Sequence, residues 1–371
     1  MVGVTVTHLA RCALLASAGL AQAPKPPSFT SPEVNGQKVT VRIYAPKATQ
    51  VLMTGDWMGR FDKPIALSRG PDGVWAGTAG PLEPNVYFYT FVVDGVRVAD
   101  PMNSDTVVSG GGRFPQSGFY IRGESAAPWE SQPVPAGSLH REFFESSLQQ
   151  RERSYYVYTP PNYRGTGGQR FPLLVLLPGT PGTEADWTAI GMANRVFDNL
   201  IAKGAMQPML VLMPRADVLV KGGTRADNLK EFEPLLAREV LPHFESRYRV
   251  KAGPDARAIA GYSLGGELAL TVGLRRPDLF RAAGSFGGSL FEKDFEDRFG
   301  KALADPASLA RQYSLIWIGC GSGDLFLPGS RRLSEILKEK NVTNTFREIA
   351  GNHGMPAFRS LLIEFLQALF R

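Results

Sequence analysis

The chain has 371 residues, of which 43% are hydrophobic, so it can bury a large core and is expected to form two domains. Its 41 lysines and arginines outnumber 35 aspartates and glutamates, which gives a formal net charge of +6 at pH 7. The basic residues are interspersed rather than gathered in a run that could follow a phosphate backbone. Nucleic-acid binding is therefore excluded as a predicted function.

Residues 1–23 have the pattern of a secretory signal peptide. Arg11 precedes the apolar stretch Ala13–Ala16, and Ala21–Ala23 offers the small residues of a cleavage site. The apolar stretch is too short to span a bilayer, and no later segment is long and apolar enough to do so. The sequence therefore predicts a secreted or periplasmic protein without a membrane span.

Residues 36–122 predict an all-β domain, after a lead-in at 24–35 that is rich in proline and serine. Residues 39–43 alternate between apolar and polar side chains, as a half-buried strand does. The apolar run Tyr87–Val93 is followed by Asp94-Gly95, a two-residue turn typical of a β-hairpin. Short strands separated by such turns predict a small immunoglobulin-like sandwich.

This region resembles the early-set immunoglobulin-like domains that precede the catalytic domain in glycogen-branching enzymes and in some esterases. The residues that carry the resemblance are Tyr44–Ala48, Gly55–Trp57, Asp72–Trp75, Val93–Gly95 and Asp100-Pro101. Trp57 and Trp75 are aromatic side chains that could stack on a sugar, but packing in the core is the stronger expectation for both.

Residues 123–137 are the expected linker, and residues 138–371 are the expected second domain. Residues 153–159 alternate like an edge strand, and after them strands alternate with helices. This alternation predicts a mostly parallel sheet with helices on both faces. The expected strands are Leu173–Leu177, Met209–Met213, Ala258–Gly261, Ala282–Phe286, Leu315–Ile318 and Thr345–Ile349, and the expected helices lie at 192–203, 227–248, 264–276, 330–340 and 357–370.

The pentapeptide Gly261-Tyr262-Ser263-Leu264-Gly265 stands between an expected strand and an expected helix. G-x-S-x-G in this position is typical of the nucleophile elbow of α/β-hydrolases, where glycines permit a tight turn that lifts the serine hydroxyl clear of the sheet. The turn also places the serine at a helix N-terminus, whose N–H groups and dipole stabilise an oxyanion. The pattern predicts an α/β-hydrolase fold with Ser263 as the nucleophile.

A serine hydroxyl needs a base to remove its proton, and that base is normally a histidine. The chain has four histidines. His8 lies in the predicted signal peptide, and His140 and His243 precede the serine. Because α/β-hydrolases carry their catalytic residues in the order serine, acid, histidine, only His353 fits, in the loop after the last expected strand.

The acid that orients the histidine should follow a strand between the serine and the histidine. Asp324 follows the apolar strand at 315–318 and is the predicted third residue. Cys320 lies in the same strand and, because Cys12 would leave with the signal peptide, has no disulfide partner and is expected to pack there. The competing acids lie at helix ends or in a charged helical stretch, a pattern typical of solvated faces; they are Asp278, Asp294, Asp297 and Asp305.

An oxyanion hole requires two preorganised N–H donors. One is expected from Leu264, the residue after the nucleophile, and the other from Thr180, in the loop after the first central strand. Trp187 falls in that same loop, and two interpretations are equally favoured: it lines the substrate pocket, or it packs inside the loop. The sequence has no metal-ligand spacing and no phosphate-binding glycine loop, and the predicted chemistry requires no cofactor.

From about residue 137 to its end, the chain resembles the esterase family that contains feruloyl and acetylxylan esterases of carbohydrate esterase family 1, enterochelin-type esterases and S-formylglutathione hydrolases. It departs from the family where the first central strand ends in Pro178-Gly179 instead of His-Gly, and where the tryptophans that many relatives carry after the catalytic histidine are missing. The matching stretches are Tyr156–Pro161, Leu176–Gly179, Glu184–Trp187, Phe197–Ile201, Pro208–Pro214, Arg257–Gly261 and Pro277–Phe280.

The resemblance implies an exported serine esterase whose substrates are feruloyl or acetyl esters of plant polysaccharide. Three alternatives stay open: a siderophore esterase of the enterochelin type, an enzyme that transfers the acyl group to a sugar, and a catalytically silent carbohydrate-binding protein. The presence of serine, aspartate and histidine in the expected order favours an enzyme over a binding protein.

Overall fold

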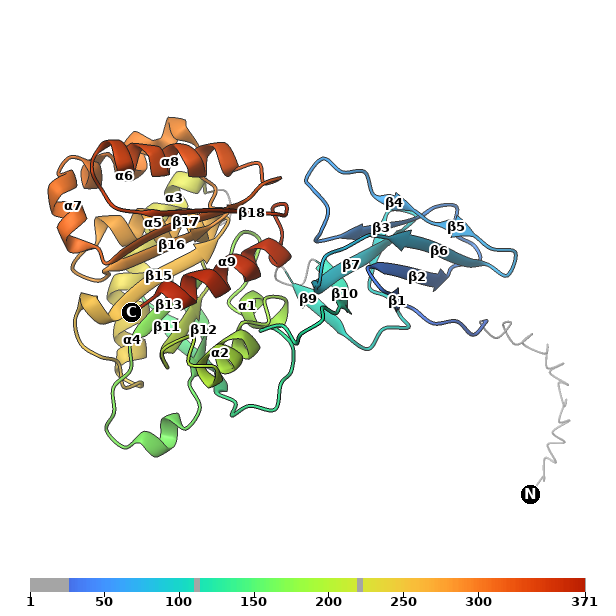
Figure 1. Ribbon diagram of the computed structural model, residues 1–371, viewed down its shortest axis with the longest axis horizontal. Coiled ribbons are helices and arrows are strands. Elements are labelled where there is room, and N and C mark those ends of the chain that lie inside the picture. The colour runs from blue at the N-terminus through green and yellow to red at the C-terminus, as the bar shows by residue number, and fades with distance from the viewer. Residues whose placement is uncertain (1–26, 110–113, 219–222, 371) are drawn as a thin grey trace, which may run out of the picture.

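The computed structural model describes residues 27–109, 114–218 and 223–370, which form two parts that lie side by side (Figure 1). The last strand of the N-terminal part ends at Ile121, and the first strand of the C-terminal part begins at Ser138. The predicted signal peptide at 1–23 lies outside the described residues. Among the described helices, none has the length and apolar character needed to cross a membrane.

The N-terminal part consists of two antiparallel sheets, in the orders β1-β2-β6-β5 and β4-β3-β7-β10-β9, with β8 paired to β7. Val41 from the first sheet and Phe91 from the second are fully buried in one apolar cluster, so the two sheets pack face to face. The all-β prediction for this region is therefore confirmed, and its immunoglobulin-like assignment stays a prediction. The strands are β1 (Glu33–Asn35), β2 (Lys38–Tyr44), β3 (Val51–Gly55), β4 (Ile65–Ala66), β5 (Ser68–Arg69), β6 (Val74–Ala79), β7 (Asn85–Val93), β8 (Val96–Val98), β9 (Thr106–Ser109) and β10 (Phe114–Ile121).

Both tryptophans of this part pack against its core. The ring of Trp57 meets Tyr87 and Phe119 edge-on, with centroid separations of 5.8 and 5.7 Å. Trp75 is buried, and its Nε1 donates a hydrogen bond of 3.0 Å to the carbonyl oxygen of Ala45. Packing, the stronger of the two expectations, is what the structure has for both side chains.

The C-terminal part is built on one eight-stranded sheet in the order β11-β12-β14-β13-β15-β16-β17-β18. β11 and β12 run antiparallel to their neighbours, and the strands from β14 to β18 are parallel. This is the predicted α/β-hydrolase arrangement. The strands are β11 (Ser138–Ser146), β12 (Arg151–Thr159), β13 (Leu173–Leu177), β14 (Leu210–Pro214), β15 (Arg257–Tyr262), β16 (Ala282–Phe286), β17 (Leu315–Gly321) and β18 (Thr345–Ile349).

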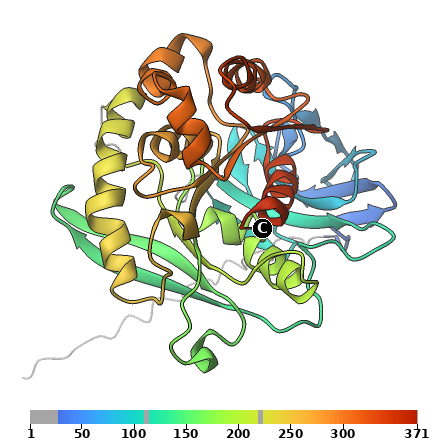
Figure 2. The ribbon, with the colours of Figure 1, turned by 60° about the vertical axis from the view of Figure 1, so that its left-hand side comes forward.

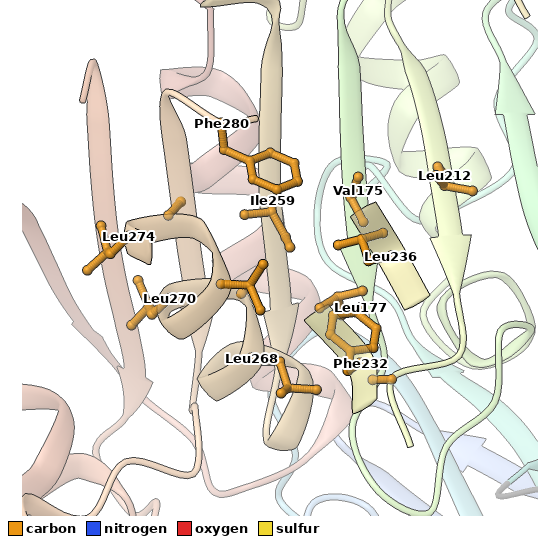
Figure 3. Packing of buried hydrophobic residues seen from close by; sticks show 14 of the residues in the cluster. Val175, Leu177, Leu212, Phe232, Leu236, Ile259, Leu268, Leu270, Leu274 and Phe280 are labelled. Carbon is orange, nitrogen blue, oxygen red and sulfur yellow. The ribbon is translucent and has the colours of Figure 1, made fainter. Parts of the chain in front are cut away.

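Helices cover both faces of this sheet (Figure 2). Side chains of α3 to α8 pack on one face in the larger apolar cluster, part of which Figure 3 shows, and side chains of α1, α2 and α9 pack on the other face. All five residues of β13 are buried because both faces of the strand are covered. The helices are α1 (Asp186–Ala189), α2 (Ala193–Ala202), α3 (Arg225–Leu235), α4 (Leu241–Glu245), α5 (Leu264–Arg275), α6 (Phe295–Leu303), α7 (Pro306–Gln312), α8 (Leu327–Glu339) and α9 (Met355–Ala368).

Two predicted elements differ from the structure. Residues 153–159 were expected at the sheet edge, but β11 pairs with β12 along its whole length and forms the edge instead. The sequence of β11 is mostly polar and most of its side chains are exposed, so it lacks the alternation that marks a half-buried strand. The helix expected at 227–248 is divided into α3 and α4 by a π-helical turn at Leu236–Val240, next to Pro242, whose nitrogen cannot donate to the helix.

Arg359 of α9 joins the two parts of the molecule. Its side chain is fully buried, and the guanidinium donates to the carbonyl oxygens of Gly191 (3.0 Å) and Ile190 (2.6 Å) in the C-terminal part. It also donates to Asn85 Oδ1 (2.5 Å) and to the carbonyl oxygen of Val86 (3.2 Å), both on β7. Burial lowers the pKa of the guanidinium to about 10, so it remains protonated at neutral pH.

Replacing Arg359 by leucine is expected to lower the free energy of unfolding by about 3 kcal/mol or more. A buried acceptor that loses its donor costs about 1–3 kcal/mol, and this change removes the guanidinium from four acceptors. Asn85 Oδ1 keeps a second hydrogen bond, from the amide of Val86, so its loss is the smallest of the four. Denaturant unfolding followed by tryptophan fluorescence measures the loss. Glu364→Ala, on the same helix, removes an exposed ion pair with Arg347 and is the matched control. Equal stability of the two variants would contradict the role given to Arg359.

Candidate active site

Ser263 lies at the turn between β15 and α5, with φ at 53° and ψ at −123°. Positive φ is strained for a residue other than glycine, and such strain is concentrated at functional turns. The amide of Ser263 donates to the carbonyl oxygen of Phe286, and its carbonyl oxygen accepts from the amide of Ser289, both at 3.1 Å. Neighbouring segments therefore fix the strained turn.

Gly261 and Gly265 flank the turn where backbone segments approach closely. A Cβ on Gly265 would lie 2.3 Å from the carbonyl oxygen of Pro178, and a Cβ on Gly261 would lie 2.7 Å from that of Leu177. Real Cβ atoms do not come within these distances of backbone oxygens, so the turn requires glycine at both positions.

His353 lies in the loop between β18 and α9. Its Nε2 is 3.0 Å from Ser263 Oγ, and its Nδ1 is 2.7 Å from Asp324 Oδ2. The rings of Phe326 and Phe358 meet the imidazole edge-on, with centroid separations of 5.1 and 5.0 Å. These two contacts restrict the rotation of the imidazole and keep each nitrogen directed at its partner.

Asp324 lies in the loop after β17, and its side chain is fully buried. While Oδ2 faces His353, Oδ1 accepts a hydrogen bond of 2.9 Å from the amide of Phe326. Backbone hydrogen bonds of 2.7 and 2.9 Å join residues 322–323 to residues 349–351, so the loop with the acid and the loop with the histidine are held together.

The other histidines of the described chain lie elsewhere. His140 is on β11, where its ring packs on Tyr248. His243 is on α4, and its Nδ1 is 2.7 Å from the hydroxyl of Tyr155. Burial lowers the pKa of His243, with Arg247 acting in the same direction. Within the described residues, His353 is thus the histidine that contacts Ser263.

Of the four competing acids, two form ion pairs with arginines and two lie at helix N-termini. Asp278 pairs with Arg276, and Asp297 pairs with Arg298. Asp294 stands at the N-terminus of α6, and Asp305 caps α7 by accepting from the amide of Ser308. None of these contacts involves His353.

A pocket of about 300 Å³ lies beside Ser263. Thr180 and Leu264, the two residues expected to supply oxyanion donors, both border it. Leu264 is the first residue of α5, where a backbone N–H has no acceptor within the helix. The lining residues are Thr180, Asp217, Arg225, Asn228, Ser263, Leu264 and Ser289.

The pocket carries charge of both signs. Arg225, the first residue of α3, donates to Glu267 Oε2 at 2.6 Å, and Arg298 donates to Glu267 Oε1 at 2.9 Å. Burial raises the pKa of Glu267, and Arg225 opposes that rise. Asp217, which also lines the pocket, has its Oδ2 3.5 Å from the hydroxyl of Thr180. A ligand in this space therefore meets both a guanidinium and a carboxylate.

Trp187 does not line the pocket, and this corrects the expectation that it binds substrate. Trp187 is on α1, and its side chain is fully buried. Its Nε1 donates a hydrogen bond of 2.9 Å to the carbonyl oxygen of Leu177 at the end of β13. The indole packs edge-on against Tyr262 and Phe286. Of the two interpretations, the structure has packing, although Trp187 lies in the short helix α1 and not in an irregular loop.

Cys320 is buried in β17 with a free thiol, as expected. Burial, followed by the neighbouring Asp324 carboxylate, raises the pKa of the thiol to about 12, so the sulfur stays protonated. Within the described residues, no group of three or more His, Cys, Asp or Glu side chains is arranged to hold a metal ion.

Several residues of the site carry no signal in the sequence. Arg225, Asn228 and Ser289 reach the pocket only because α3 and the loop after β16 converge on the catalytic turn. Asn352 gives a weak signal, because it immediately precedes His353. Its partner lies in the N-terminal part, and sequence spacing cannot reveal it.

A family model and several curated proteins match this chain. The family model described as "Putative esterase" matches residues 146–369. The chain is 28% identical over 303 residues to an endo-1,4-beta-xylanase/feruloyl esterase of Xylanibacter ruminicola, a match that covers 80% of this chain and 40% of that protein. The chain spans about half or less of the length of the curated relatives it matches.

Solved structures share the fold. An enterobactin esterase of Shigella flexneri superposes with a TM-score of 0.69 at 19% identity, covering 90% of this chain and 93% of that one. A ferulic acid esterase of carbohydrate esterase family 1 from Anaeromyces mucronatus superposes with a TM-score of 0.54 at 20% identity, covering 64% of this chain and 92% of that one. Because the family model spans more than half of the chain and includes Ser263, Asp324 and His353, this chain belongs to the Esterase family.

Proposed function

We propose that the chain is a serine carboxylic-ester hydrolase that works through an acyl-enzyme. The observation that carries the proposal is the line of hydrogen-bonding groups from Ser263 Oγ to His353 at 3.0 Å and from His353 to Asp324 at 2.7 Å, beside a pocket. A nucleophile, a base and a group that orients the base are what serine catalysis requires, and all are within hydrogen-bonding reach of one another.

In the proposed reaction, His353 Nε2 takes the proton of Ser263 while Oγ forms a bond to the carbonyl carbon of the ester. The amides of Leu264 and Thr180 donate to the oxyanion. The tetrahedral intermediate collapses when the ester C–O bond breaks, and His353 gives its proton to the leaving alcohol. Water then attacks the acyl-enzyme with His353 again as base, which releases the acid and restores the serine.

Feruloyl or acetyl esters of plant polysaccharide are the substrate class we propose. The relative named endo-1,4-beta-xylanase/feruloyl esterase supports this, since its similarity extends over 80% of this chain. The pocket residues Asp217 and Arg225 are consistent with it, because a carboxylate accepts from sugar hydroxyls and a guanidinium donates to them. The predicted signal peptide at 1–23 supports a secreted or periplasmic location, where such polymers are met.

A siderophore ester of the enterochelin type is the second candidate. The observation that favours it is the two-part architecture: the superposition on a protein named enterobactin esterase covers 90% of this chain and so includes N-terminal sheets. The ferulic acid esterase superposition covers 64%.

The test compares hydrolysis of p-nitrophenyl acetate, methyl ferulate and an enterobactin-type trilactone by the whole chain, followed by mass analysis of quenched reactions. We expect higher kcat/KM for one of the first two esters than for the trilactone, with one acyl group trapped on the peptide that contains Ser263. Faster hydrolysis of the trilactone would select the siderophore function. A folded protein that binds xylan and hydrolyses none of the three esters would instead support a silent carbohydrate-binding protein.

A further inference from the structure

The loop that carries His353 is held from one side by the N-terminal sheets. Asn352 Nδ2 donates a hydrogen bond of 3.0 Å to the carbonyl oxygen of Trp57, 295 residues earlier in the chain. Trp57 follows β3, and its ring packs on Tyr87 and Phe119 in the N-terminal core. The acceptor of this hydrogen bond is therefore anchored in a packed sheet.

The same loop is also in tight contact with two backbone segments. A Cβ built on Gly323, in the loop after β17, would lie 2.2 Å from Asn352 Oδ1. The side-chain amide of Asn352 therefore packs directly against that loop. On the other side of His353, a Cβ built on Gly354 would lie 2.2 Å from the carbonyl oxygen of Asp56. The residues before and after the histidine thus both contact the N-terminal part.

We propose that the N-terminal part positions the catalytic imidazole, and that Asn352 is the positioning residue through which this support acts. The inference rests on the proposed serine esterase function. His353 Nε2 must stay within hydrogen-bonding reach of Ser263 Oγ, and a displacement of about 1 Å can lower a rate about 10²-fold. A hydrogen bond at the adjacent residue limits how far loop 350–354 can shift. Arg359 ties the helix that follows this loop to β7.

The test compares Asn352→Ala and Asn352→Asp with the unchanged chain. Alanine removes the side chain, whereas aspartate keeps its shape and replaces the donor by an oxygen that faces another oxygen at Trp57. We expect both variants to hydrolyse p-nitrophenyl acetate with a kcat lowered about 10- to 100-fold and with KM unchanged. If Asn352 only stabilised the interface, its replacement would lower Tm and would not lower kcat selectively while KM stays constant.

Ser360→Ala is the matched control for disturbance of the interface. Ser360 borders the same pocket of about 370 Å³ between the two parts as Trp57 and Asn352. Its hydroxyl donates to the carbonyl oxygen of Pro356 on its own helix. It has no hydrogen bond to Ser263, His353 or Asp324. This variant is expected to keep the kcat of the unchanged chain.

A second measurement avoids dependence on any one ester. A fluorophosphonate labels an activated serine: Oγ forms a bond to phosphorus, fluoride leaves, and the base takes the proton. The labelling rate of Ser263, followed by mass spectrometry, is expected to fall in both Asn352 variants by the same factor as kcat. Rapid labelling that is equal in the unchanged chain and in both variants would overturn the positioning role and leave the serine mechanism standing. Failure of the unchanged chain to label would overturn both.

Discussion

Replacing Ser263 by alanine is expected to lower kcat for every ester that the chain hydrolyses, by about 10⁶-fold. The proposed acyl-enzyme cannot form without Oγ, and the remaining rate comes from the oxyanion donors and from substrate binding. The loss should fall on kcat, since the pocket keeps its other lining residues. Steady-state rates with a p-nitrophenyl ester and with methyl ferulate measure the effect.

Ser289→Ala is the control for this experiment. Its hydroxyl lies 3.5 Å from Ser263 Oγ and borders the same pocket, but it has no hydrogen bond to His353. We expect Ser289→Ala to continue forming an acyl-enzyme. If Ser263→Ala keeps its activity while Ser289→Ala loses it, the nucleophile has been assigned to the wrong residue.

Asp324→Asn is expected to lower kcat by about 10⁴-fold while the fold is retained. Because Asp324 Oδ1 accepts from the amide of Phe326, the carboxamide will place its oxygen there and its NH₂ group toward His353 Nδ1. The imidazole must then carry its proton on Nε2. In that tautomer the nitrogen 3.0 Å from Ser263 Oγ is a donor and cannot accept the serine proton.

Asp278→Asn is the control for the removal of a carboxylate that does not contact His353. Asp278 is an exposed partner of Arg276, and its replacement should leave kcat unchanged. Circular dichroism of both variants checks that the fold persists. An Asp324→Asn variant with normal kcat would show that His353 needs no orienting acid.

Much of the fold follows from local patterns in the sequence. The strands Leu173–Leu177, Ala282–Phe286 and Thr345–Ile349 coincide with the expected bounds. The first two are fully buried on both faces, which forces a continuous run of small or apolar residues. The candidate site is predictable for a different reason: a serine at a strand-to-helix turn has few possible partners in a chain with four histidines.

The remaining features depend on contacts that spacing cannot reveal. Trp187 follows a central strand as a pocket residue would, but its indole finds a hydrogen-bond acceptor at Leu177 inside the core. β11 becomes a strand through pairing with β12, because its own sequence is too polar to show the alternation. The contact between Asn352 and Trp57 joins residues almost 300 positions apart, and no local pattern encodes it.

The tie between α9 and β7 has a consequence for the order in which the molecule is completed. Asn85 is synthesised 274 residues before its partner Arg359. During that interval the part of β7 that α9 contacts stays exposed on the growing chain, because α9 has not yet been synthesised. The histidine loop immediately precedes the same helix, so the hydrogen-bonded series Ser263–His353–Asp324 and the junction between the two parts are both completed only once α9 has been made.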